Sequence, residues 1–213
     1  MNIRNDILDK ITPDVRVEMQ KIWFTADLHH SHAKIVDICN RPVSHEDHNE
    51  WLLKEVFNKY VQKKDEVYII GDVSFAKRKD AEKWIAHMNG NKHLILGNHD
   101  KNIKNLRNWA EVTQIKDFTF SRGNLNIHIV LCHYPLASWN RKIYGSMHLY
   151  GHVHGRFENT GLSYDVGIDN TCNKYGIFHW LRPLNLYEVL QIMNERQKQG
   201  LDKDHTEVTV EID

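Results

Sequence analysis

Polar residues able to bind metal ions follow five short apolar runs of the sequence. Each run is rich in β-branched or aromatic residues, as buried strands are, and each ends in aspartate, asparagine or histidine. The residues at these ends are Asp27, Asp72, Asn98, His133 and His152. Carboxylate, amide and imidazole groups are common ligands of divalent transition metals. The five strand ends therefore predict a metal centre.

Two further histidines follow two of these residues at a spacing of two. His29 comes two positions after Asp27, and His154 comes two positions after His152. In an extended chain, side chains at positions i and i+2 point to the same side, so each pair is expected to face one crevice. Seven candidate ligands are too many for one tetrahedral zinc ion, and they suit two adjacent cations that also hold water.

Each of these residues also has an ordinary structural explanation. An aspartate such as Asp27 or Asp72 at the end of a strand usually forms a turn or caps a helix. A single histidine such as His133, after an apolar run, usually packs at the rim of the core. The metal centre is favoured because residues of this kind stand at all five ends.

The surrounding elements explain how these separate segments could meet. The apolar runs cover residues 22–27, 67–72, 94–98, 127–133 and 147–152, and helical patterns cover 33–39, 44–60, 79–90 and 184–197. Strands that alternate with helices predict an α/β layered fold. In open α/β sheets the ligand crevice lies beyond the carboxyl ends of the strands. The candidate ligands are thus expected at one edge of the sheet.

Local signals refine these elements. Ser44 and Asp47 suit the start of the second helix, and Gly90 suits the end of the third. Residues 118–130 read as a hairpin around Arg122-Gly123-Asn124, so a purely parallel sheet is not expected. The tail at 207–212 alternates like an edge strand, but its polar, acidic flanks suit disorder equally well.

Composition limits the possible classes of protein. The 213 residues contain 28 Lys and Arg and 28 Asp and Glu, so no overall charge favours nucleic acid or an anionic membrane. The three cysteines form no CxxC pair, which suits a reducing compartment. The N-terminus is too charged for a signal peptide, and no apolar run reaches the ~20 residues of a membrane span. We expect a cytoplasmic protein with one domain over residues 1–213.

In combination, the motif blocks resemble the calcineurin-like metallophosphoesterases. The blocks are DLH at 27–29, GD at 71–72, GNHD at 97–100, CH at 132–133 and GHVH at 151–154. They define a motif core of about residues 21–170, with an N-terminal extension at 1–20 and a C-terminal helix and tail at 184–213. The stretches TADLHHSHAKIVDICNRP and LCHYPLASWN are similar to small phosphoesterases of phage and bacterial type.

The resemblance implies a fold and argues against one substrate class. The implied fold is an α/β double β-sandwich with mixed sheets, flanked by helices, and with a dinuclear site at one sheet edge. Asp72 is followed by VSFAKRK, whereas the protein-phosphatase branch continues as GDxVDRG. A phosphoprotein is therefore not the expected substrate.

The resemblance also implies roles for individual residues. Asp27, His29 and His154 would hold one cation, Asn98, His133 and His152 the other, and Asp72 would bridge them. Manganese is the expected metal, and iron, zinc, cobalt and nickel suit the same ligands. A metal-activated hydroxide would attack phosphorus. His99 would protonate the leaving oxygen, and Asp100 would orient the His99 ring.

Residues outside the motif blocks allow more than one reading. Arg41 could bind phosphate oxygens, or it could be a solvated loop residue. The basic cluster at 76–79 could receive a charged substrate, although basic residues at the start of the following helix are the commoner explanation. Trp139 and Tyr144 could stack a nucleobase, but packing at the rim is the commoner role of such rings. Among the histidines near the motifs, His32 is the best further candidate.

These observations predict a dinuclear metal-dependent phosphoesterase that acts on a small phosphomonoester or phosphodiester, nucleotide-derived ones included. One alternative is a nuclease of the same superfamily, which would need an extended basic groove. The other is a non-enzymatic scaffold, as in the retromer subunit of this fold, and it is disfavoured because every ligand position and His99 are present. The expected partner is a small phosphorylated molecule, with no membrane. The sequence leaves the oligomeric state open.

Overall fold

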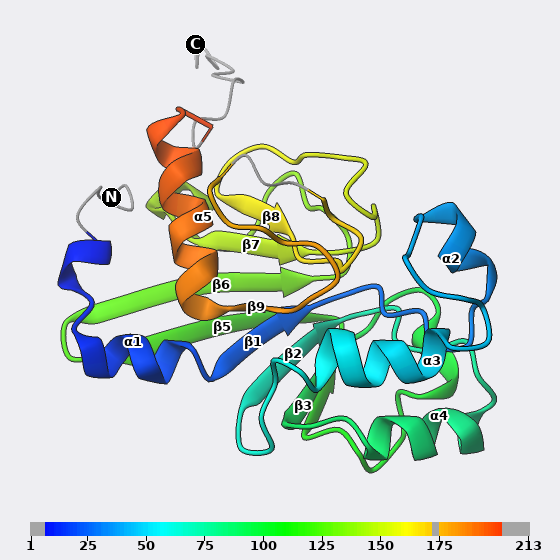
Figure 1. Cartoon of the computed structure of the whole chain (residues 1–213). Helices are drawn as coiled ribbons and strands as arrows, with labels where there is room; N and C mark the ends of the chain where they lie inside the picture. Colours follow the sequence, from blue (N-terminus) through cyan, green and yellow to red (C-terminus); the bar gives the residue numbers. More distant parts are fainter. Residues whose placement is uncertain (1–6, 172–174, 202–213) are drawn as a thin grey trace, which may run out of the picture.

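Two β-sheets pack face to face in the computed structural model, which describes residues 7–171 and 175–201 (Figure 1). The strand order is β4-β3-β2-β1-β9 in the first sheet and β5-β6-β7-β8 in the second. The strands are β1 Ile22–Thr25, β2 Glu66–Ile70, β3 Asn91–Ile95, β4 Glu111–Thr113, β5 Ile115–Arg122, β6 Leu125–Cys132, β7 Met147–Tyr150, β8 Ser163–Asp165 and β9 Leu184–Asn185. Both sheets are mixed, as expected, because β9 and β5 run antiparallel to their neighbours.

Residues of the first sheet alternate between two cores. Phe24 and Tyr68 face the second sheet, whereas Trp23 and Val67 face the helices on the other side. This alternation follows from the pleat of a strand, which turns successive side chains to opposite faces. The central strands β1 and β2 are buried on both faces and mostly apolar, as buried parallel strands are, whereas β3 begins with the polar residues Asn91, Lys92 and His93. The centre of this sheet therefore lies between two hydrophobic cores.

Helices cover the outer face of the first sheet. They are α3 His48–Trp51, which continues as the π-helix η2 Leu52–Phe57, and α4 Arg78–Ala86. Their buried residues, such as Phe57 and Trp84, join the core with Trp23 and Val67. The short helix α2 Lys34–Ile38 follows β1 and lies beside the other two at the same end of the sheet (Figure 1).

The core between the sheets also includes the two terminal helices. These are α1 Pro13–Met19 and α5 Leu186–Lys198, and they contribute residues such as Met19 and Leu190. The short 3-10 helix η1 Leu8–Lys10 precedes α1. The described part of the predicted N-terminal extension is therefore packed against the sandwich. Two more 3-10 turns are η3 Asp100–Asn102 and η4 Lys142–Tyr144.

All five predicted strands are present, but four end before the candidate ligand. β1 ends at Thr25, two residues before Asp27, and only β6 runs directly into its ligand, His133. The candidate ligands thus lie mostly on the loops that leave the strands. The hairpin is confirmed, with Arg122 opposite Leu125 across the turn.

The predicted helices differ from the observed ones at their ends. The second begins at His48, because Ser44 and Asp47 bond to each other in the turn before it. The third ends at Ala86, four residues before Gly90. The late helix starts at Leu186 with a capping box between Asn185 and Glu188. The tail at 207–212 lies outside the described residues. Among the described helices, none has the length and apolarity that crossing a membrane requires.

Candidate metal centre

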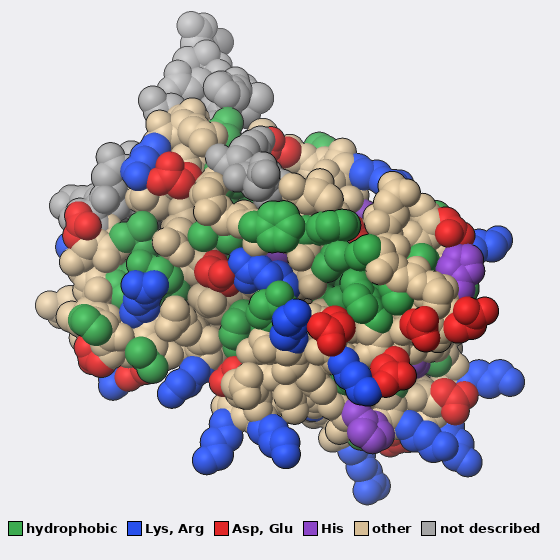
Figure 2. Space-filling view, in the orientation of Figure 1, with side chains coloured by type: hydrophobic (Ala, Val, Ile, Leu, Met, Phe, Trp, Pro, Cys, Tyr) green, Lys and Arg blue, Asp and Glu red, His purple; other side chains and the backbone are tan. Residues whose placement is uncertain are grey.

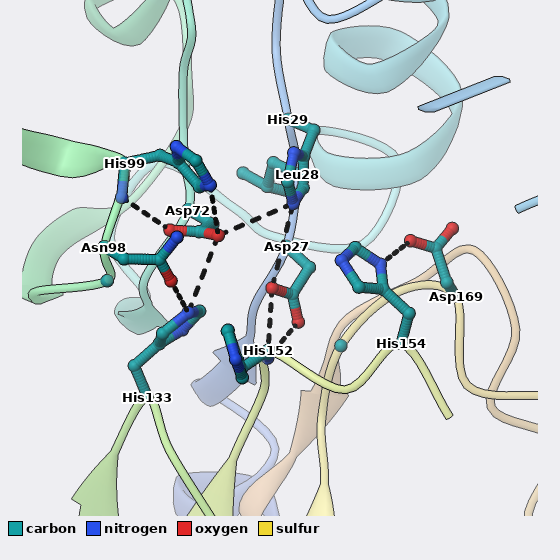
Figure 3. A network of polar contacts seen from close by, with 12 residues as sticks. Asp27, Leu28, His29, Asp72, Asn98, His99, His133, His152, His154 and Asp169 are labelled. Carbon is teal, nitrogen blue, oxygen red and sulfur yellow. Dashed lines mark hydrogen bonds and ion pairs between the residues drawn. The ribbon is translucent and has the colours of Figure 1, made fainter. Parts of the chain in front are cut away.

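The seven candidate ligands lie together beyond the carboxyl ends of both sheets (Figure 3). Six of them form two groups in which one ligand atom per residue lies within 4.8 Å of the others. The first group is Asp27, His29 and His154, and the second is Asp72, His133 and His152. Residues up to 127 positions apart in the sequence thus form one cluster.

Asp72 belongs to the second group and also lies close to the first. Its Oδ2 is 3.7 Å from Nε2 of His29 and 3.6 Å from Nε2 of His133. Asn98 lies on the side of the second group, with its Oδ1 3.3 Å from Nε2 of His133. Asp72 thus lies close to ligand atoms of both groups, and Asn98 lies close to the second group (Figure 3).

The backbone of most candidate ligands is left-handed. Positive φ angles occur at Asp27 (59°), His29 (54°), Asp72 (55°), His152 (70°) and His154 (49°). This conformation costs L-residues roughly 1–2 kcal/mol and clusters at functional sites. The expectation that residues 27–29 and 152–154 are extended is therefore wrong. The side chains of Asp27 and His29 converge because the backbone turns at both positions.

Two glycines allow the loops to approach each other closely. A Cβ at Gly97 would lie 2.4 Å from Oδ1 of Asp72, and a Cβ at Gly151 would lie 2.6 Å from Oδ2 of Asp27. Either contact would displace a carboxylate. This explains why glycine precedes Asn98 and His152 in the motifs.

The polar atoms of the cluster suit bound cations. Both ring nitrogens of His29 are buried and have no hydrogen-bond partner, an arrangement that is costly unless another group binds them. His133 donates Nδ1–H to the carbonyl of Ile70 at 2.8 Å, and Nδ1 of His154 contacts Asp169 at 2.7 Å. In each of these rings the other nitrogen, Nε2, is therefore placed to bind a cation, as in most histidine metal sites.

Burial and neighbouring charges shift the pKa values of these groups. Burial raises the pKa of Asp27 to about 7 and lowers the pKa of His29 to about 3. Burial opposes ionisation of Asp72, but the contact with His133 outweighs it and lowers the pKa of Asp72 to about 2. A bound cation would favour the ionised form of Asp27 and the neutral form of His29.

His99 lies beside the cluster without joining either group. Its side chain is 43% exposed, and its Nε2 is 4.0 Å from Oδ2 of Asp72. The ring packs against Phe75 at 4.4 Å, and the backbone N–H donates to Oδ1 of Asp72 at 3.0 Å. The imidazole can therefore reach a molecule bound over Asp72.

The structure corrects the role expected for Asp100. Its carboxylate is fully buried and accepts three backbone N–H groups, from Asp72, Val73 and Gly97, at 2.8–2.9 Å. None of these contacts involves the His99 ring. Asp100 ties together the two loops that carry Asp72 and Asn98, which a spacing of one residue from His99 could not reveal.

Arg41 has neither of the two roles that the sequence suggested, phosphate binding or a solvated position in a loop. It is neither solvated nor open to substrate, because it is buried and bonded to Asp169, His48 and two backbone carbonyls. Sequence reasoning missed Asp169, which contacts both Arg41 and His154. The segment SYDVGIDN at 163–170, with two aspartates around a glycine after a short apolar run, was the available signal.

The remaining candidates divide between core and rim. Trp139 is buried and donates its Nε1–H to the carbonyl of Ser146, so it is not open to a nucleobase, whereas Tyr144 is exposed. His32 stacks on Phe75 at 4.3 Å next to His29. His30 stacks on Trp84. Phe75 thus lies between the rings of His32 and His99 and shapes the rim.

The comparison with known families agrees with this geometry. The sequence profile of the calcineurin-like phosphoesterases matches residues 20–169, which include all seven candidate ligands. The chain belongs to this family. Calcineurin-like phosphoesterases are metal-dependent in general, and the two ligand groups give this member a matching set of nitrogen and oxygen atoms.

Relatives of this calcineurin-like phosphoesterase occur in phages and archaea. Gene 66 protein of Mycobacterium phage D29 is 28% identical over 206 residues, which cover 83% of this chain and 98% of the phage protein. An uncharacterized protein of Methanocaldococcus jannaschii is 33% identical over 141 residues, covering 65% of this chain and 72% of that protein. A solved structure of a protein of unknown function from Aquifex aeolicus has the same fold, with a TM-score of 0.55 and 20% identity, over 80% of this chain and 98% of the other.

Proposed function

We propose that this phosphoesterase holds two divalent cations and hydrolyses small phosphomonoesters or phosphodiesters, nucleotide-derived ones included. The observation that carries the proposal is the position of Asp72. Its Oδ2 lies 3.7 Å and 3.6 Å from a nitrogen of each ligand group, as one carboxylate shared by two cations would. We propose manganese as the metal in cells, with iron, zinc, cobalt and nickel able to replace it.

The ligands would be divided as the two groups divide them. Asp27, His29 and His154 would hold one cation, and Asn98, His133 and His152 the other, with Asp72 between. When bound, such a pair supplies Lewis-acid polarisation of the phosphoryl oxygens and an activated water. The protein contributes ligands that are already in place on strained loops, so little rearrangement is needed on binding.

His99 would act as the general acid. Its ring is exposed on the side of the cluster, and Phe75 supports one of its faces. From this position it can donate a proton to the leaving oxygen of a phosphoester bound over Asp72. The neighbouring ring of His32 can contact the same substrate, because it packs on Phe75 from nearby.

A small substrate is favoured over a nucleic acid. The chain has 28 basic and 28 acidic residues and therefore no net charge. On the face shown in Figure 2, acidic side chains lie among the lysine and arginine side chains of the right half. The balanced charge argues against the counterion release on which nucleic-acid binding depends.

The test is a metal titration with matched substrates. Protein treated with a chelator is assayed with bis-p-nitrophenyl phosphate and with a panel of nucleotides and sugar phosphates as manganese is added. Activity that rises until two manganese ions are bound per chain supports the proposal. Full activity without metal, or a binding limit of one ion, would contradict it. Cleavage of DNA or RNA that weakens steeply with salt would favour the nuclease instead.

A further inference from the structure

The guanidinium of Arg41 is buried beside the first ligand group, where no substrate can reach it. We infer that Arg41 is a positioning residue that fixes Asp27, His29 and His154, and thereby sets the affinity of one of the two cations. The inference rests on the proposed function in taking these three residues as the ligands of one of two cations.

Every N–H group of Arg41 has a partner inside the protein. Nε donates to Oδ1 of Asp169 at 2.8 Å. Nη1 donates to the carbonyl of Leu28 at 2.9 Å and contacts Nε2 of His48 at 2.8 Å. Nη2 donates to the carbonyl of Asp27 and to Oδ2 of Asp169, both at 2.8 Å. A guanidinium has five N–H donors, so none is left for a phosphoryl oxygen.

One arm of this network reaches His154. The two oxygens of Asp169 accept the Nε–H and one Nη2–H of Arg41. Oδ2 of Asp169 also lies 2.7 Å from Nδ1 of His154. Asp169 is buried, and contacts with Arg41 and His154 engage both of its carboxylate oxygens. The carboxylate therefore fixes the ring of His154 with its other nitrogen toward Asp27 (Figure 3).

The other arm reaches the backbone of Asp27 and of Leu28, the residue before His29. Arg41 binds the carbonyls of Asp27 and Leu28, which stand in the turn where Asp27 and His29 have positive φ. Donors at this point stabilise a backbone conformation that would otherwise be costly. A single guanidinium thus holds all three members of the first group. Among the described contacts, it reaches no member of the second group.

Lysine cannot replace this function. An ammonium has three donors and no planar fork, so it cannot hold both oxygens of Asp169 and the two carbonyls together. Arg41→Lys keeps the charge and removes the geometry. Asp169→Asn keeps the shape and removes the charge that orients His154. Both variants should weaken the binding of the cation at the first group and leave the binding of the other cation unchanged.

The experiment measures manganese binding by calorimetry on chelator-treated full-length chain. Wild type is expected to bind two ions, and Arg41→Lys and Asp169→Asn to weaken one of them by about 10–100-fold, as the loss of such supporting contacts typically does. The matched control is Arg196→Lys. Arg196 is equally buried and bonds Gly161, Asn159, Glu158 and Tyr175, none of them a candidate ligand. Unchanged affinity in both test variants, or an equal loss in Arg196→Lys, would overturn the inference.

Two further measurements separate the alternatives. At saturating manganese, inhibition by inorganic phosphate should be unchanged in Arg41→Lys. Weaker inhibition by phosphate together with normal metal affinity would show instead that Arg41 binds the substrate. If wild type binds no manganese, the proposed function fails, and metal-free crystals of Asp169→Ala then test the inference alone. The His154 ring should leave its wild-type orientation, and an unmoved ring would contradict the positioning role.

Discussion

Oδ2 of Asp100 accepts the backbone N–H of Asp72 at 2.9 Å, so the residue after His99 holds the loop that carries the central carboxylate. The same oxygen accepts Gly97 N–H, and Oδ1 accepts Val73 N–H. Asp100, the last residue of the GNHD motif, therefore ties this motif to the loop that carries Asp72. A buried carboxylate with several N–H donors of this kind is a structural support of the site.

Replacing Asp100 should destabilise the protein. Asp100→Ala leaves three buried N–H groups without an acceptor. We expect the free energy of unfolding to fall by on the order of 3 kcal/mol or more, measured by urea denaturation of the metal-free chain. His99→Ala, at an exposed side chain, serves as the control and should change stability little. A fully stable Asp100→Ala that lost only activity on poor leaving groups would instead show that Asp100 serves His99.

Removing His99 should affect substrates according to their leaving groups. A general acid matters most where the leaving oxygen departs poorly by itself. His99→Ala should keep its bound metal and much of its activity on nitrophenyl esters, yet lose ~10²–10⁴-fold on alkyl phosphoesters. The rates of both ester classes and the metal content are measured on the same preparation. A common loss on both classes, or a loss of metal, would show that His99 is not the acid.

Asp72 should matter more than Asn98. Asp72→Asn removes the negative charge of a carboxylate whose Oδ2 lies near a ring nitrogen of each group, those of His29 and His133, whereas Asn98→Ala removes an amide oxygen near His133. We expect Asp72→Asn to impair the binding of both ions and Asn98→Ala that of one. Metal analysis after dialysis checks this. Two tightly bound ions in Asp72→Asn would contradict the bridging position.

Metal replacement should distinguish the kinds of cation. After chelation, manganese is expected to restore hydrolysis, whereas calcium should restore little, because calcium favours shells made of oxygen and this cluster is rich in imidazole. Initial rates with each ion at equal concentration are compared. Equal recovery with calcium would argue against imidazole ligation.

Acid should destabilise the fold partly through His179, which belongs to neither ligand group. Burial, together with the charge of Arg182, lowers the pKa of His179 to about 3, against 6.5 for a free side chain. Between pH 6.5 and 3 the unfolded chain is protonated at His179 while the folded chain is not, and this favours unfolding. The stability of the fold is therefore unaffected by His179 above pH 6.5 and falls as pH drops toward 3. At pH 5 the loss is about 2 kcal/mol.

Unfolding curves between pH 7.5 and 5 measure this slope. His179→Phe should show a shallower fall in stability with acid than wild type. His45→Gln, at an exposed side chain, provides the comparison. An identical pH slope in wild type and His179→Phe would mean that His179 does not carry the effect.

The sequence by itself determined the ligand types and the strands that bring them together. Strand propensity and apolar runs act over a few residues, so the positions of Asp72 and His133 after strands were readable without coordinates. Because carboxyl ends of neighbouring parallel strands share one edge, the proximity of Asp27, Asp72 and Asn98 after β1, β2 and β3 followed as well. His133 follows β6 of the other sheet, so its place beside Asp72 depends on how the two sheets pack. The hairpin at 118–130 was predicted from an equally local signal.

Only the tertiary structure decided how these residues are held. The partner of Arg41 is Asp169, 128 positions away, and no local pattern links the two. The left-handed backbone at Asp27 and His29 was likewise hidden, because it is imposed by contacts with other loops against the local preference of the chain. Spacing determines which groups can approach one another. Which donor meets which acceptor depends on how the whole chain closes around them, since buried polar atoms must find their partners wherever the fold places them.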